Sequence, residues 1–200
     1  MRQLALGISP PPQPTLENFV PGANTELVAR LRDLVAGTLA ESIVYLWGEA
    51  GSGKSHLLRA CARRGVHAAD DVEALDDAGQ VDLFKRINDA RQSGGAVLAA
   101  GLAPPAQLAL REDLRTRLGW GLVYQVRTLS DAERATFLRA EAGRRGMRLG
   151  DEVIAYLLAR VRRDLPSLTA ILDQLDRASL ERQRQITLPL VRDTLKITEE

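Results

Sequence analysis

The sequence predicts an α/β domain with a parallel sheet, followed by a small domain made only of helices. Continuous apolar runs separated by helical stretches are typical of parallel strands that helices cover on both faces. Four such runs occupy residues 43–47, 66–69, 96–100 and 122–126. After residue 129, only segments with helical spacing of apolar residues follow, at 131–145, 151–163, 166–184 and 188–197.

The remaining segments follow in order along the chain. Residues 1–22 become proline-rich after the eighth residue and have no sustained period, so we expect an extended arm there. Apolar residues between Glu26 and Leu39 recur at the spacing of one helix face. Ser130 and Glu133 have the spacing of a capping box at the start of the helical domain. We therefore expect the α/β domain at 23–128 and the helical domain at 129–200.

The composition indicates an ordinary globular protein. The chain has 200 residues, is 45% hydrophobic and carries a net charge of +1, which permits a sizeable core and does not favour nucleic acid as the default partner. Cys61 is the single cysteine and cannot form an internal disulfide. No long apolar run or signal-peptide pattern occurs, so we expect a cytoplasmic protein without membrane contact.

A phosphate-loop pattern lies between the first apolar run and the next helical stretch. Residues 48–55 read GEAGSGKS and match G-x-x-x-x-G-K-[ST] at every fixed position. Glycines let backbone N–H groups turn toward phosphate oxygens, and the following helix adds the positive end of its dipole. Lys54 would reach the β- and γ-phosphates, and Ser55 would bind Mg²⁺. The expected nucleotide-binding residues are Gly48, Glu49, Ala50, Gly51, Ser52, Gly53, Lys54 and Ser55.

Two carboxylates follow the second apolar run, where a Walker B motif would sit beside the phosphate loop. Asp70 would hold Mg²⁺ through water. Asp71 stands where hydrolysis would need a base that orients water. It could equally be the start of an acidic loop that continues into Glu73, Asp76 and Asp77, so both interpretations of Asp71 stay open.

Several further segments occur in an order that resembles the AAA+ ATPases of the DnaA group. Besides the phosphate loop and the acidic strand end, they are GLAPPAQL at 101–108, DLRTRLGWGLVYQV at 113–126, LSDAERATFLRAEAGRRGM at 129–147 and LDQLDRASLERQRQITLPLVRDTL at 172–195. The resemblance covers nearly the whole chain. It is strongest to the regulators of this group, which lack the DNA-binding domain of the initiator, and it implies a P-loop AAA+ sheet followed by a helical lid.

The resemblance also implies partners. The hexapeptide QLALGI at 3–8 is similar to the family's clamp-binding peptide, whose glutamine and aliphatic side chains dock on the DNA polymerase sliding clamp. The clamp-binding residues would be Gln3, Leu4, Leu6 and Ile8, and DNA would be reached indirectly through the clamp. Arg117 stands at the family's arginine-finger position, from which it would act in trans on DnaA-bound ATP. The competing interpretation is a surface arginine at a helix C-terminus. Trp120 is expected to pack in the same turn.

Three departures from the family pattern bear on hydrolysis. Only residues 56–65 separate the phosphate loop from the Walker B strand, so one edge strand should be missing and the Walker B strand should lie at the rim of the sheet. Leu102, followed by Ala103, replaces the polar sensor-1 residue. Pro166 takes the place of the sensor-2 arginine and has the pattern of a helix-start proline after Asp164.

Together these features predict that binding of ADP or ATP survives better than hydrolysis. The expected function is that of a nucleotide-bound regulator of chromosomal replication initiation, which inactivates DnaA with the help of the sliding clamp. The alternative is a self-contained AAA+ ATPase such as a helicase loader, in which Asp71 would be the base and Arg117 would serve a homo-oligomer. A ligand-free scaffold is a third interpretation.

Overall fold

The structure, a computed structural model, describes residues 13–162 and 164–196 and divides into two compact units. Within these ranges, the first unit contains residues 13–19, 26–48 and 53–126, and the second contains 20–25, 49–52 and 127–196. The division after Val126 lies close to the boundary at 128 that the sequence suggests. None of the helices described is both long enough and apolar enough to cross a membrane.

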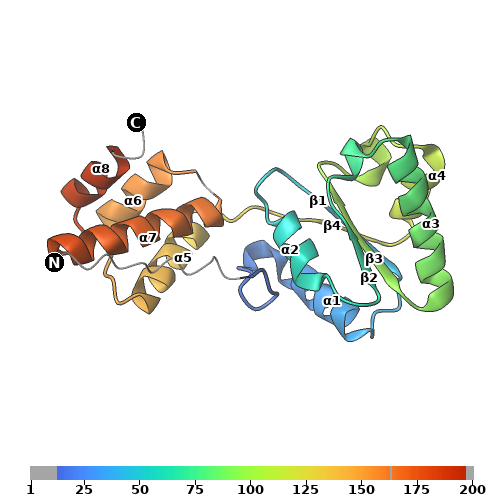
Figure 1. Cartoon of the computed structure of the whole chain (residues 1–200), viewed down its shortest axis with the longest axis horizontal. Helices are drawn as coiled ribbons and strands as arrows, with labels where there is room; N and C mark the ends of the chain where they lie inside the picture. The colour runs from blue at the N-terminus through green and yellow to red at the C-terminus, as the bar shows by residue number, and fades with distance from the viewer. Residues whose placement is uncertain (1–12, 163, 197–200) are drawn as a thin grey trace, which may run out of the picture. The chain divides into compact units, whose positions relative to one another are not determined.

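Four parallel strands form the sheet of the first unit. They are β1 (Ile43–Trp47), β2 (Val66–Ala69), β3 (Ala96–Gly101) and β4 (Leu122–Gln125). Their order across the sheet is β2-β3-β1-β4 (Figure 1). In the centre, β1 pairs with β3 from Ile43–Val97 onward and with β4 from Val44–Leu122 onward. All four apolar runs are strands, which confirms the predicted parallel α/β sheet.

Helices cover both faces of this sheet. The first face packs against α1 (Thr25–Ala36) and α2 (Lys54–Cys61), and the second against α3 (Asp77–Ser93) and α4 (Glu112–Gly119). Because successive side chains of a strand point to opposite faces, Val44 and Leu46 enter the first core and Ile43 and Tyr45 the second. Cys61 is fully buried in the first core, and this burial raises the pKa of its thiol to about 11.

The strand β2 forms one edge of the sheet. It pairs only with β3, from Val66–Ala96 to Ala69–Ala99. Between α2 and β2 the described chain forms one isolated bridge, Arg63–Val66, and no additional strand. The short connection therefore leaves one side of β2 without a neighbouring strand, as the sequence predicted. All four β2 side chains are only half-buried, whereas four of the five in β1 are fully buried.

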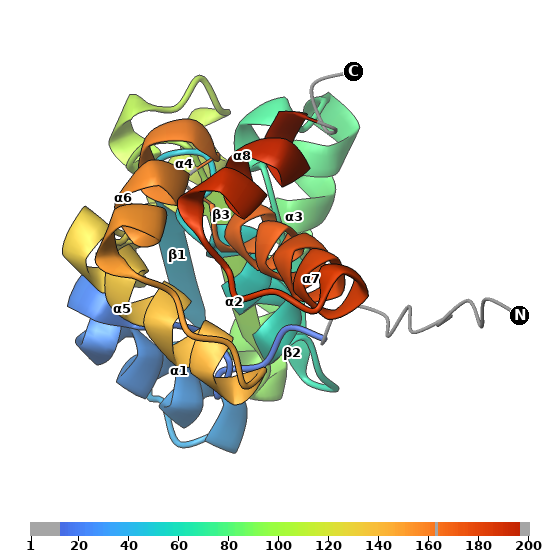
Figure 2. The same ribbon diagram turned by 90° about the vertical axis from the view of Figure 1, so that its left-hand side faces the viewer.

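The second unit is a helical domain with its own core. It contains α5 (Asp131–Arg144), α6 (Asp151–Arg160), α7 (Leu165–Arg182) and α8 (Leu188–Lys196) (Figure 2). The predicted capping box starts α5: the Ser130 N–H donates to the Glu133 carboxylate at 2.7 Å, and the Glu133 N–H donates to the Ser130 hydroxyl at 3.3 Å. The helix α6 ends earlier than the predicted residue 163, because Val161 adopts an extended backbone.

Residues 13–19, which fall in the predicted arm, pack on the first unit. Leu16 is buried in the core that α1 and α2 form with the sheet. The Thr15 carbonyl lies 2.9 Å from His56 Nε2, and the Phe19 ring centroid lies 5.5 Å from that of His56. This part of the predicted arm is therefore packed rather than extended. The predicted clamp-binding residues Gln3, Leu4, Leu6 and Ile8 lie outside the described residues.

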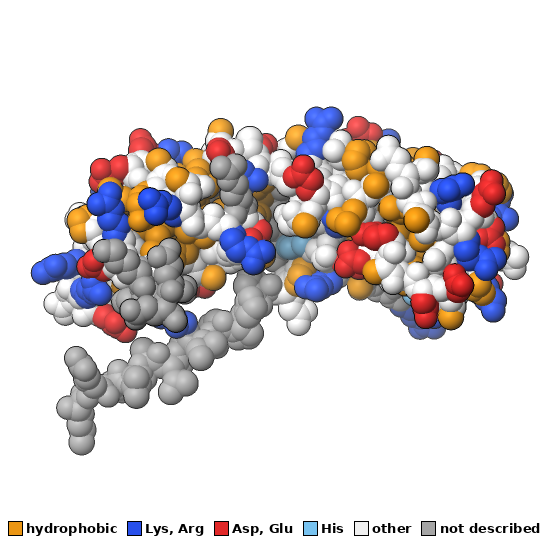
Figure 3. Space-filling model, turned by 90° about the horizontal axis from the view of Figure 1, so that it is seen from above, with side chains coloured by type: hydrophobic (Ala, Val, Ile, Leu, Met, Phe, Trp, Pro, Cys, Tyr) orange, Lys and Arg blue, Asp and Glu red, His pale blue; other side chains and the backbone are white. Residues whose placement is uncertain are grey.

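Charged side chains of both signs are interspersed on the visible face of each unit rather than segregated (Figure 3). This distribution agrees with the net charge of +1.

Candidate functional site

The phosphate-loop segment leads from the carboxyl end of β1 into α2. Gly51 and Gly53 have φ angles of 78° and 101°, which side chains other than glycine rarely adopt. At Gly53, a Cβ would also come within 2.8 Å of the Phe19 ring. Because Gly53 precedes the first residue of α2, the first free N–H groups of that helix open onto the loop. The loop thus has the backbone shape that an anion at a helix N-terminus requires.

The Lys54 side chain bonds across the loop. Its side chain is almost fully buried, at 6% exposure, and Nζ donates a hydrogen bond to the Gly48 carbonyl at 2.7 Å. The ammonium therefore lies between the two ends of the loop. Phosphate oxygens are charged acceptors and would bind this ammonium more strongly than a neutral carbonyl does.

Ser52 supplies a second sign that the loop fits a phosphate. Ser52 is 8% exposed, and its Oγ has no hydrogen-bond partner among the described residues. A buried hydroxyl without a partner is costly, on the order of 1–3 kcal/mol. A phosphate oxygen in the loop would remove that cost, so the residues present fit the phosphates of a bound nucleotide.

Asp70 and Asp71 follow the carboxyl end of β2. Because all four strands are parallel, this is the same end of the sheet as the loop after β1. Asp71 has φ 47° and ψ 51°, a strained backbone conformation that favours glycine. Its N–H donates a hydrogen bond to the Asp70 carboxylate at 3.1 Å. Within the described ranges, no group of three or more His, Cys, Asp and Glu side chains is placed to hold a metal. Ser55 and Asp70 would suit Mg²⁺, which retains water and takes phosphate oxygens as further ligands.

The position expected for sensor 1 offers no polar side chain. Leu102 directly follows β3 and is 54% exposed. The next residue, Ala103, accepts a hydrogen bond through its carbonyl from the Tyr45 hydroxyl at 3.0 Å. Burial raises the pKa of Tyr45, and the negative charge of Glu73 raises it further, so the phenol stays protonated as a donor. Tyr45 therefore fixes the backbone after β3, while Leu102 cannot hydrogen-bond a γ-phosphate.

The position expected for sensor 2 is the start of α7. Pro166 lies in the first turn of α7, and the Asp164 carboxylate accepts a hydrogen bond from the Ser167 N–H at 2.9 Å. The predicted helix-start proline is confirmed. The nearby Arg162 pairs with Asp164 at 3.5 Å, and Arg163 lies outside the described residues.

Arg117 lies at the opposite end of the sheet, where the parallel strands begin. It belongs to the last turn of α4, and the chain continues through Trp120 and Gly121 into the amino end of β4. A Cβ on Gly121 would come within 2.2 Å of the Ile43 carbonyl, which places this turn against the amino end of β1. The phosphate loop follows the carboxyl end of β1, about 16 Å further along the strand. Arg117 therefore lies near the amino end of β1, whereas its own loop lies beyond the carboxyl end of that strand.

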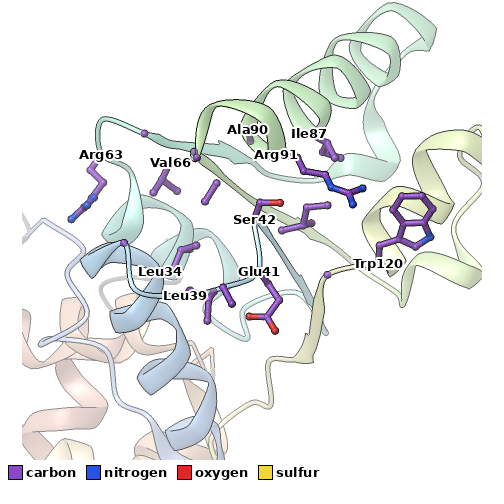
Figure 4. Close-up of a pocket in the computed structure, with 18 of the residues that line it drawn as sticks. Leu34, Leu39, Glu41, Ser42, Arg63, Val66, Ile87, Ala90, Arg91 and Trp120 are labelled. Carbon is purple, nitrogen blue, oxygen red and sulfur yellow. The ribbon is translucent and has the colours of Figure 1, made fainter.

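A pocket of about 760 Å³ lies beside Arg117 and Trp120, at the amino ends of the strands (Figure 4). Its walls include four arginines and a single carboxylate: Arg63, Arg64, Arg91, Arg117 and Glu41. The Arg91 guanidinium is directed toward the Trp120 ring in Figure 4 and lies 5.9 Å from the ring centroid. Trp120 packs against Arg117 of the same turn, whose guanidinium lies 4.2 Å from the Trp120 ring centroid, as expected, but the residue is 59% exposed. Sequence spacing gave no signal for the pairing of Trp120 with Arg91.

Comparisons with known proteins bear on the fold and on the helical domain. The family model of the Hda lid domain matches residues 131–195. The fold is similar to domain III of the replication initiation protein DnaA from Thermotoga maritima, with a TM-score of 0.74 and 20% identity over 92% of this chain and 96% of that chain. A replication initiator DnaA bound to AMPPCP and single-stranded DNA matches with a TM-score of 0.72 and 20% identity, over 86% of this chain and 68% of that chain. A RuvB variant from Thermotoga maritima matches with a TM-score of 0.68 and 15% identity, over 93% of this chain and 72% of that chain.

The parallel sheet, the phosphate loop and the following helical lid define an AAA+ protein. Residues 131–195 match the lid domain of Hda, and the fold of the chain is similar to that of DnaA.

Proposed function

We propose that this protein is a nucleotide-bound adapter of the Hda type, which acts with the sliding clamp to stimulate hydrolysis of DnaA-bound ATP and so inactivates the initiator. The observation that carries this proposal is the position of Arg117 at the end of the sheet opposite its own phosphate loop. An arginine at that end of the sheet would be available to a nucleotide held by another molecule rather than to its own. The planar guanidinium offers several N–H donors to the charge that spreads over the phosphoryl oxygens in the transition state.

The protein's own nucleotide has a different role in this proposal. Backbone N–H groups of the loop and Lys54 would hold the α- and β-phosphates, while Ser55 and Asp70 would place Mg²⁺, which neutralises phosphate charge when bound. The apolar Leu102 and the helix-start Pro166 leave the γ-phosphate without a sensing side chain. A resident nucleotide would therefore stabilise the fold and would turn over slowly.

Calorimetric titration should show that ADP binds at least as tightly as ATP. Neither of the two positions that the family pattern assigns to γ-phosphate sensing, Leu102 and Pro166, carries a donor side chain, so the γ-phosphate should not improve affinity. Both titrations are to be run with Mg²⁺ and at one ionic strength, because phosphate contacts weaken with salt. A preference for ATP of tenfold or more would contradict the proposed role of the loop.

Deleting residues 1–8 should abolish binding to the sliding clamp and leave nucleotide affinity unchanged. Gln3 would supply hydrogen bonds, and Leu4, Leu6 and Ile8 would fill an apolar pocket on the clamp. The described cores begin at Leu16, which the deletion leaves in place. A matched control replaces residues 1–8 with the same residues in scrambled order. Clamp capture that survives both changes rules out this peptide as the tether.

A self-contained ATPase is the second candidate, because the strained Asp71 lies beside Asp70 at the metal end of the sheet. ATP turnover decides between the two functions. The adapter should show little turnover alone, and hydrolysis of DnaA-bound ATP should rise only when the protein and the DNA-loaded clamp are both present. Turnover by the purified protein alone at the full rate would favour the ATPase and a homo-oligomer in which Arg117 acts between copies.

A further inference from the structure

Trp120 is an exposed aromatic residue on a rigid turn. Its side chain is 59% exposed, although a large apolar ring is normally covered. The turn itself is fixed: the Trp120 N–H donates to the Arg117 carbonyl at 3.2 Å, and Gly121 touches the amino end of β1. The ring forms one wall of the pocket in Figure 4. Core packing therefore does not account for a tryptophan at this position.

The Arg117 guanidinium rests on aromatic rings. It lies 4.2 Å from the centroid of Trp120 and 5.6 Å from that of Phe84 in α3. No ion pair or side-chain hydrogen bond joins Arg117 to another residue of the part of the chain that the structure describes. Arg111, in the same region, instead pairs with Asp113 at 3.0 Å. A ring face attracts a guanidinium without using its N–H groups, so the donors of Arg117 stay available for phosphate oxygens.

A second cation approaches the same ring. Arg91 comes from the end of α3, with its guanidinium 5.9 Å from the Trp120 centroid. Two positive charges on one ring repel each other, and the single carboxylate of the pocket wall is Glu41. An anionic group that enters between Arg91 and Arg117 would relieve this repulsion. The corner around Trp120 is thus suited to the phosphates of a partner's nucleotide.

We propose that Trp120 is a positioning residue for Arg117. Its indole face and the ring of Phe84 in α3 hold the guanidinium without engaging its N–H donors, so that these donors can contact a nucleotide bound to the partner. This role rests on the proposed function, since it concerns how the same arginine acts in trans. Preorganisation of this kind should affect the rate of the stimulated step more than the assembly of the complex.

Two substitutions test the proposal. Trp120→Leu keeps an apolar side chain and removes the aromatic face, whereas Trp120→Phe keeps a smaller face. In the presence of DnaA and DNA-loaded clamp, Trp120→Leu should lower the maximal rate of hydrolysis of DnaA-bound ATP about tenfold, with an unchanged half-saturating concentration. Trp120→Phe should retain most of the rate. A loss confined to the half-saturating concentration would overturn the proposal and make Trp120 a docking contact, and an unchanged rate would overturn it as well.

NMR of the arginine side chains gives a readout that does not depend on DnaA. Ring currents of Trp120 and Phe84 should displace the Arg117 Nε–Hε resonance of the wild-type protein, and Trp120→Leu should move it toward ordinary arginine positions. An Arg117 Nε–Hε resonance at an ordinary arginine chemical shift in the wild-type protein would contradict the positioning role. If the displacement is present and the wild type does not stimulate DnaA, the proposed function is wrong, while the contact that holds Arg117 is established.

Discussion

Arg117→Ala should abolish the stimulation of hydrolysis of DnaA-bound ATP and leave the fold, nucleotide binding and clamp binding intact. The expected loss is about 10³-fold or more, the range in which an arginine supplied in trans accelerates phosphoryl transfer. Such a loss follows because the guanidinium interacts with charge that develops mainly in the partner's transition state. The measurement is the rate of hydrolysis of DnaA-bound ATP with DNA-loaded clamp present.

The fold should tolerate this change. Arg117 is half-buried and its side chain contacts the rings of Trp120 and Phe84, contacts worth on the order of 0.5–1 kcal/mol at a partly exposed site. Arg117→Lys should also be poor, since an ammonium lacks the planar fork of donors. Arg115→Ala, on the same helix, is the matched control and should keep the stimulation. Full activity of Arg117→Ala together with loss in Arg115→Ala would assign the finger to Arg115 instead.

Lys54→Ala should weaken the binding of both ADP and ATP by about 100-fold or more. Lys54 is the buried cation of the phosphate loop, and each hydrogen bond between charged groups contributes about 1.5–3 kcal/mol. The substitution also removes the bond from Nζ to the Gly48 carbonyl, so a small loss of stability without nucleotide is expected. Titration calorimetry and thermal unfolding with and without ADP measure the two effects separately.

The matched control for this experiment is Lys85→Ala. Lys85 lies in α3 on the surface of the first unit and is exposed, so its removal changes the net charge by the same amount. Nucleotide affinity and the thermal shift caused by ADP should both be preserved. Equal affinity of Lys54→Ala and the wild type would mean that the loop does not hold phosphates, and the adapter would then be a ligand-free scaffold.

The strands and the site loop were predictable because each depends on local sequence. A strand buried in a parallel sheet must be apolar along its whole length, which made 43–47 and 96–100 recognisable. The glycines, lysine and serine of 48–55 follow a spacing that the loop geometry itself requires. Pro166 after Asp164 indicated the start of α7 for the same reason, because caps are local.

Contacts between distant residues were not predictable in this way. Phe19 packs beside Gly53 and His56, and no periodicity in a proline-rich stretch indicates such a partner. Phe84 meets Arg117 only because α3 and α4 pack on the same face of the sheet. The exposure of Trp120 likewise depends on how its turn meets β1, and a tryptophan beside two glycines is equally compatible with a buried ring.

The free side of β2 has a consequence for the proposed Mg²⁺ site at Asp70. No described strand pairs with β2 on that side, where the Val66 N–H donates to the Arg63 carbonyl at 3.0 Å. Local opening of β2 therefore breaks the ladder to β3 and this one turn bond, with no second ladder to break, and such opening is easiest where few contacts are lost. Asp70 directly follows β2. Metal affinity and the protection of β2 amides from hydrogen exchange should therefore be thermodynamically linked: bound Mg²⁺ and nucleotide would slow exchange along this strand, and a partner that covered the strand's free side would tighten the hold on the metal.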